Sequence, residues 1–144
     1  FLYCIGEEHP SVFLRQWKFS NKKIKDIVAV LLAIRSRKSK SWDAVFLYKT
    51  GIQVALMAER VYQTIIENYD MSSVDQVQTL FDSLSIQNRQ EMNVSGNDLL
   101  NWTDKAPGPW VAEVLQKIEE EILQGQLVNE KENIREWLQG CSLL

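Results

Sequence analysis

Apolar residues recur every three or four positions along most of the chain, which is the spacing of one helical face. The segment "SNKKIKDIVAVLLAI" opens with a polar pair typical of a helix start and then places five apolar residues on one side: Ile24, Ile27, Val28, Leu31 and Leu32. A short helix is expected from Ser41 as its cap to Gly51 as its stop. Another helix follows, with Leu56, Val61, Ile65 and Ile66 on it.

The same periodicity continues through the second half of the chain. Ser73 and Gln76 have the spacing of a capping box, and so do Asn129 and Glu132, each ahead of an apolar stripe. Ser95 is placed to cap a short helix, a longer helix is expected to end at Gly125, and Gly140 should close the last one. Only "FLYCI", residues 1–5, is a weak strand candidate. The pattern predicts an all-α fold of seven or eight short helices.

Composition and charge narrow the class of protein. With 144 residues, 45% of them hydrophobic, the chain can bury a real core. It has no apolar run near the ~20 residues of a membrane span, and no membrane partner is expected. Cys4 and Cys141 favour reduced thiols in a cytoplasmic protein. The start, on an apolar run without methionine, is typical of a piece of a longer protein.

Positive charge is concentrated at the two ends of the first strong helix. Residues 1–70 carry 11 Lys and Arg against 7 Asp and Glu, whereas residues 71–144 carry 5 against 12. Each cluster has a tryptophan nearby, Trp17 or Trp42, which suits phosphates with an aromatic side chain for stacking. Solvated helix ends are the alternative interpretation. The clusters consist of Lys18, Lys22, Lys23 and Lys25, then of Arg35, Arg37, Lys38 and Lys40.

The stretch "KAPGPWVAEVLQ", residues 105–116, combines two prolines and a glycine ahead of a helix. Pro109 fits the first helical position, where its missing N–H costs nothing. Gly108 would let another molecule approach the backbone, so that helix-start amides could bind phosphate with Lys105 and Trp110 nearby. Alternatively, the two prolines only force a sharp turn between helices.

Catalytic and metal-binding motifs are missing from the sequence. It contains no GxxxxGK[ST], GxGxxG or HExxH, and the lone His9 is expected to be a surface residue at a helix start. The run Glu119, Glu120 and Glu121 is expected to be a solvated helix face. We therefore predict no catalytic residue, no metal ligand and no cofactor in this chain.

A resemblance to a known family rests on several motifs together. "SGNDLL", "PGPW", the Gly125–Leu127–Asn129 link and Trp137 resemble the C-terminal end of bacterial class II CCA-adding enzymes, the tRNA nucleotidyltransferases. "WKFSNKKIKDI" resembles an upstream segment of the same family. The resemblance covers most of the chain and is strongest over residues 95–138.

The resemblance implies an enzyme of head, neck, body and tail, of which this chain is similar to the body and tail, with a body-like segment 1–88 and a tail-like segment 89–144. In the family those parts hold the acceptor and TΨC arms of tRNA. The head, with its magnesium-binding carboxylates, adds C, C and A to the tRNA 3′ end from CTP and ATP. The implied partner of this chain is tRNA, and the chain alone would be inactive; a homodimer is possible.

Two other readings of the residues stay open. The chain could be a helical protein-interaction or dimerisation module without an RNA role, in which Trp102, Trp110 and Trp137 simply pack. It could also be a helix-hairpin-helix that holds DNA without sequence preference. Charge reversal at Arg37 and Lys38 separates the first reading from the tRNA-binding one, and binding of duplex DNA separates the second.

Overall fold

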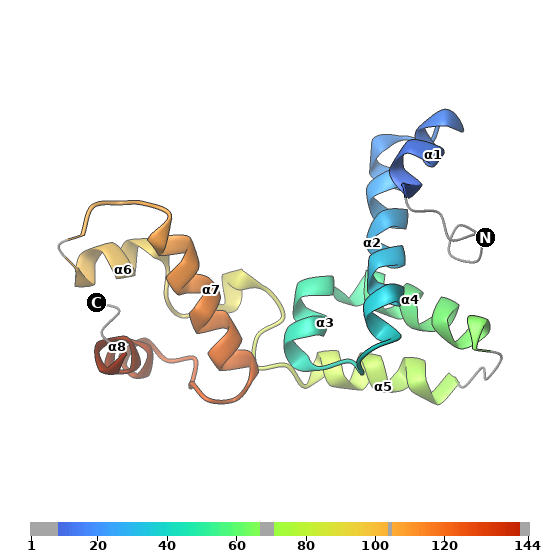
Figure 1. Cartoon of the computed structure of the whole chain (residues 1–144). Helices are drawn as coiled ribbons and strands as arrows, with labels where there is room; N and C mark the ends of the chain where they lie inside the picture. The colour runs from blue at the N-terminus through green and yellow to red at the C-terminus, as the bar shows by residue number, and fades with distance from the viewer. Residues whose placement is uncertain (1–8, 67–70, 104, 142–144) are drawn as a thin grey trace. The chain divides into compact units, whose positions relative to one another are not determined.

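The computed structural model of the chain describes residues 9–66, 71–103 and 105–141, except for the side chain of Met71. Over these residues it contains eight α-helices, one 3₁₀ helix and no strand (Figure 1). The all-α prediction is therefore confirmed, and the strand candidate 1–5 lies outside the described residues. The chain divides into two compact units, Phe1–Phe81 and Asp82–Leu144, whereas the predicted body–tail boundary falls between residues 88 and 89.

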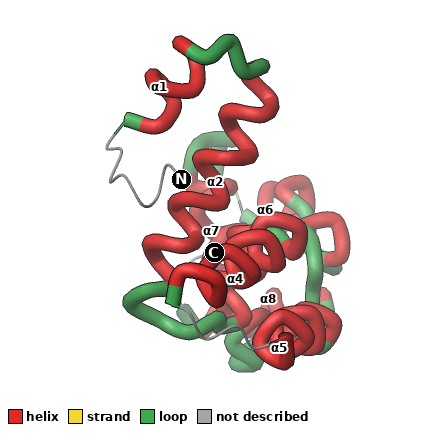
Figure 2. The backbone as a smooth tube through the Cα atoms, turned by 90° about the vertical axis from the view of Figure 1, so that its right-hand side faces the viewer, coloured by secondary structure: helices red, strands yellow, loops and turns green. Residues whose placement is uncertain are grey.

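The first unit is built around two long helices that pack on each other. Its helices are α1 (Pro10–Gln16), α2 (Asn21–Arg37), α3 (Ala44–Thr50), α4 (Ile52–Ile65) and α5 (Met71–Asp82). Figure 2 shows α1 folding back beside the start of α2, and α2 also contacts α4. Small residues let α2 and α4 approach, since Ala33 and Ala58 meet beside Ile34 in one buried cluster. A second cluster joins α3, α4 and α5 through Leu47, Ala55 and Val77.

The caps of the first unit differ in part from the predicted ones. Ser20 caps α2 as expected by accepting a hydrogen bond from the Lys23 amide. Asp43, not Ser41, caps α3, because its carboxylate accepts from the Phe46 amide at 2.7 Å. Gly51 ends α3 with a φ of 79°, a conformation that suits glycine. The predicted capping box at Ser73 is wrong, since α5 already begins at Met71.

The second unit contains the 3₁₀ helix η1 (Arg89–Glu91) and three α-helices: α6 (Gly96–Trp102), α7 (Trp110–Leu123) and α8 (Lys131–Gly140). Helix α6 contacts α7, and the core holds fully buried Ile86, Leu99, Ile118, Ile122, Ile134 and Leu138. Ser95 and Asp98 form the predicted capping box of α6. Gly125, with φ 72°, follows α7 in a Schellman motif, in which the Gln126 amide donates to the Glu121 carbonyl at 2.9 Å.

Asn129 does not cap the last helix, so that prediction is wrong. The residue before α8 is Glu130, and no side chain caps the helix. Instead, Asn129 Oδ1 accepts from the Asn93 amide at 3.0 Å, and its Nδ2 donates to the Glu91 carbonyl at 2.8 Å. Asn93 Nδ2 returns a bond to the Asn129 carbonyl. Asn129 therefore joins the segment after η1 to the segment before α8.

Candidate nucleic-acid interface

The four lysines predicted around the start of α2 are all exposed. Lys22 and Lys23 lie in the first turn of α2, which contains no acidic residue, and Lys25 follows one turn later. A helix start has a partial positive charge, so cations there cost roughly 0.3–1 kcal/mol each. The presence of Lys22 and Lys23 is consequently not explained by helix stability.

Lys18 occupies an equally unfavourable backbone position. It has a φ of 57°, which is uncommon for a residue other than glycine. The Lys18 amide donates to the Arg15 carbonyl at 2.9 Å and the Phe19 amide donates to the Leu14 carbonyl at 3.2 Å, which closes α1 with a Schellman motif. Glycine is the usual residue at this point, and a lysine there again needs a reason other than the stability of the fold.

The second basic cluster, at the end of α2, is more involved in the fold. Arg35 and Arg37 lie in the last turn of α2, where the helix dipole favours cations. Lys40 lies 4.2 Å from the centre of the Phe46 ring and 3.6 Å from an Asp43 carboxylate oxygen. Lys38, which follows the helix, is exposed. Since α2 has 17 residues, the two clusters lie roughly 25 Å apart and form two patches rather than one.

Arg37 forms an ion pair with a buried carboxylate that the sequence analysis missed. Glu59 on α4 is fully buried, and Arg37 Nε donates to it at 2.8 Å. Trp42 Nε1 and Gln63 Nε2 donate to the same carboxylate, each at 2.8 Å. Burial raises the pKa of Glu59, but the hydrogen bonds from Arg37, Gln63 and Trp42 outweigh it and hold the pKa below its usual value. The sequence signal that could have predicted this pair is the position of Glu59, which shares the inner face of α4 with Ala55 and Ala58.

The contacts of Glu59 bear on which of the two tryptophans, Trp42 or Trp17, could stack on a nucleic acid. Trp42 is stacked on Phe46 at 4.4 Å between ring centres and is bonded to Glu59, so it belongs to the fold. Trp17 is 67% exposed and directly precedes Lys18 in the chain. Charge reversal at Arg37 would break a buried ion pair, so it cannot separate loss of RNA binding from loss of structure.

The PGPW turn, residues 107–110, is held by contacts with neighbouring residues of the chain. Trp110 begins α7, one residue later than predicted, and its Nε1 donates to the Ala106 carbonyl at 2.9 Å. A Cβ at Gly108 would lie 3.3 Å from Trp110 Cδ1, so the glycine makes room for the chain's own indole. The Val111 and Ala112 amides already donate to Gly108 and Pro109 carbonyls. The turn therefore has a structural reason, and the amides predicted to bind phosphate are in part occupied.

The cations of the second unit lie beside carboxylates or indole rings. Lys105 lies 5.6 Å from the Trp110 ring, Lys117 lies 5.8 Å from the Trp137 ring, and both Lys131 and Arg135 lie within 6 Å of the Trp102 ring. Lys131 also pairs with Asp98. The hydrogen bonds from Lys131 and Ser95 lower the pKa of Asp98 to about 2.

Glu119 is not on a solvated face, contrary to the sequence analysis. It is buried on α7, and its two carboxylate oxygens accept from Arg89 Nε at 2.6 Å and Nη2 at 2.8 Å. This bidentate pair attaches η1 to α7. The run of three glutamates gave no signal of it, because the inward position of Glu119 depends on where η1 folds.

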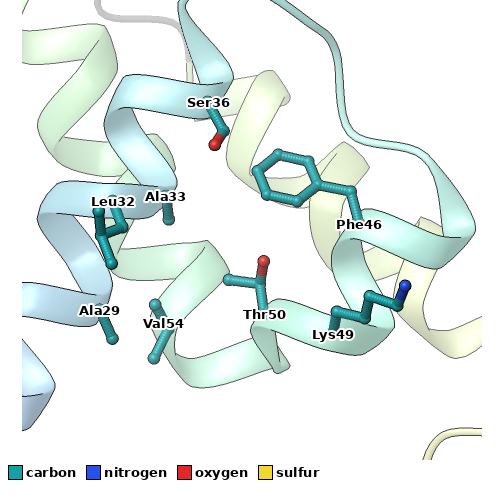
Figure 3. A pocket seen from close by; sticks show the side chains of 8 residues that line it. All are labelled: Ala29, Leu32, Ala33, Ser36, Phe46, Lys49, Thr50 and Val54. Carbon is teal, nitrogen blue, oxygen red and sulfur yellow. The ribbon is translucent and has the colours of Figure 1, made fainter.

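No metal site accompanies these surfaces in the described part of the chain. Among the described residues, no group of three or more His, Cys, Asp or Glu side chains is placed to hold a metal ion. A pocket of about 230 Å³ between α2, α3 and α4 is smaller than most ligand sites; in Figure 3 the Phe46 ring points into it and the Lys49 ammonium points away. No helix there has the length and apolar character needed to cross a membrane.

Comparison with known proteins shows which family the chain belongs to. The sequence profile described as "tRNA nucleotidyltransferase domain 2 putative" matches residues 1–138. The chain belongs to this family. It is 80% identical to the CCA-adding enzyme of Bacillus cytotoxicus and 78% identical to that of Bacillus mycoides, in each case over all 144 residues of the chain and 36% of the relative.

A solved structure supports the same assignment. The crystal structure of the Bacillus stearothermophilus CCA-adding enzyme in complex with CTP matches 99% of this chain and 36% of that protein, with a TM-score of 0.94 and 30% identity. The resemblance to CCA-adding enzymes seen in the sequence is thus confirmed. The chain spans about a third of the length of these tRNA nucleotidyltransferases.

Proposed function

We propose that this chain is the tRNA-binding body and tail of a CCA-adding enzyme. It would hold the acceptor and TΨC arms while residues outside these 144 add C, C and A to the tRNA 3′ end. The observation that carries the proposal is the match of the whole chain, at 80% identity, to a CCA-adding enzyme. The catalytic carboxylates, magnesium, CTP and ATP would belong to the rest of the protein, with which the chain would act in the cytoplasm.

We place the main phosphate contacts of the first unit at Lys18, Lys22, Lys23 and Lys25. Lys18 has a left-handed backbone, and Lys22 and Lys23 oppose the dipole of α2, so binding an anion is a direct reason for cations at these positions. Contacts of this kind follow the shape and backbone of RNA and need no reading of bases.

The test compares two double variants of the full-length protein. Lys22→Gln/Lys23→Gln removes two charges from the proposed contact, and Lys49→Gln/Arg60→Gln removes two exposed charges elsewhere in the first unit. Binding to total tRNA and to duplex DNA of equal length is measured over a salt series. The first variant should bind tRNA more weakly, with a salt slope reduced by about 2 relative to the control.

Each other reading predicts a different result. Equal tRNA affinity of the two variants would refute the lysine contact. If neither the unsubstituted protein nor its variants bound tRNA, the helical interaction or dimerisation module would be the better reading. Equal affinity for duplex DNA and tRNA would favour the helix-hairpin-helix interpretation. The possible homodimer is tested separately by sedimentation.

A further inference from the structure

An apolar groove of about 870 Å³ opens between α1, α2 and α4 of the first unit. Its walls include Trp17 and Phe19 after α1, Ile27 and Leu31 on α2, and Met57 on α4. Trp17 is 67% exposed, Met57 51% and Phe19 41%. Single exposed apolar side chains are ordinary, but a continuous apolar surface of this kind usually marks an interface.

The chemistry of the groove is unlike that of the lysine contact nearby. Asp26 is its only charged lining residue, and no lysine or arginine lines it. A phosphate backbone needs cations, so the groove is unsuited to nucleic acid. Its occupant must instead supply apolar side chains.

We propose that the groove is filled by a segment of the same polypeptide from outside these 144 residues. The relatives that match the whole chain are much longer, since the match covers only 36% of each, and the solved relative shares this fold at a TM-score of 0.94. A segment of the same molecule is present at high effective concentration and can cover an apolar surface at any protein concentration. The proposal depends on family membership and not on tRNA binding.

The test uses single cysteines in the full-length protein. Met57→Cys places a thiol in the groove, and Gln53→Cys places one on the exposed surface of the same helix. Maleimide labelling is followed at each site by peptide mass spectrometry. Labelling at position 57 should be at least tenfold slower than at position 53. Equal rates would show that the groove is open and would overturn the proposal.

A measurement on the unsubstituted protein removes any concern about folding. Within this chain Trp17 is more exposed than the half-buried Trp102, so an open groove predicts faster oxidation of Trp17 by hydroxyl radicals. We expect the opposite order in the full-length protein. Faster oxidation of Trp17 would contradict the proposal.

Cross-linking identifies the occupant. Photo-methionine at position 57, in a mixture of isotopically light and heavy protein, should cross-link to a peptide outside residues 1–144 of the same copy. A cross-link between light and heavy copies would show that a second molecule fills the groove and would overturn the proposal. So would cross-links confined to residues 1–144.

Discussion

Replacement of the buried Glu59 by glutamine should destabilise the first unit strongly. Glutamine keeps the size of the side chain and still accepts hydrogen bonds, but its amide group faces the Arg37 guanidinium without a charge to pair with it. Breaking a buried ion pair costs about 3–5 kcal/mol. Because the Arg37 side chain is 20% exposed and stays partly hydrated, we expect the lower end of that range, about 3 kcal/mol.

Native-state hydrogen exchange measures this loss helix by helix. A decrease of about 3 kcal/mol in the free energy of opening should speed exchange of the protected α2 and α4 amides by roughly 100- to 200-fold. The amides of α7, in the other unit, are an internal control. Glu136→Gln, at an exposed position on α8, is the matched control variant. A change below about 0.5 kcal/mol for Glu59→Gln would refute the reasoning.

The effect should also depend on pH with a definite sign. The pKa of Glu59 is lower in the folded chain than in the unfolded chain, so ionised Glu59 stabilises the fold at pH values above its unfolded pKa. That stabilisation is lost as the pH falls through the folded pKa. The difference between the unsubstituted chain and Glu59→Gln should therefore be largest near neutral pH and shrink in acid.

Three further changes test other parts of the fold and interface. Gly125→Ala should cost about 1 kcal/mol through its positive φ alone, since no atom lies within 4 Å of the added Cβ; in thermal unfolding, Gly140→Ala is the control, and an equal melting temperature for both would contradict the strain. Asn129→Ala removes two side-chain hydrogen bonds and should cost about 2 kcal/mol in exchange of the second unit, whereas Asn133→Ala should change little. Lys18→Gly should raise the melting temperature by relieving the left-handed backbone and weaken tRNA binding at the same time, and unchanged affinity would exclude Lys18 as a contact.

Local signals in the sequence were sufficient for the helices. The apolar spacing, Ser20, Ser95 and Gly51 act within one or two turns, so they could be read without the fold. Two errors were local, since Asp43 rather than Ser41 caps α3 and α5 begins before Ser73. The other errors arose where a side chain serves a distant segment. Asn129 has the spacing of a cap but bonds to residues more than 30 positions away, and Glu119 turns inward to meet Arg89.

The residues of the candidate interface also divide into those that local sequence signals identify and those whose role depends on distant contacts. The lysines at the start of α2 could be found by counting charges, and their exposure follows from the polar side of an amphipathic helix. Arg37 and Trp42 looked equivalent to them, because a count of charged and aromatic residues does not show which ones face a buried carboxylate. The occupied amides of the PGPW turn depend on the Trp110 rotamer, which spacing does not reveal.

The buried Glu59 also constrains how the family can diverge. One carboxylate accepts from donors on α2, on the segment before α3 and on α4, so a relative that lost it would leave the donors of Arg37, Trp42 and Gln63 turned toward an apolar interior. Such a relative should carry compensating replacements at several of these positions at once. The four residues are thus expected to be inherited or exchanged as a set.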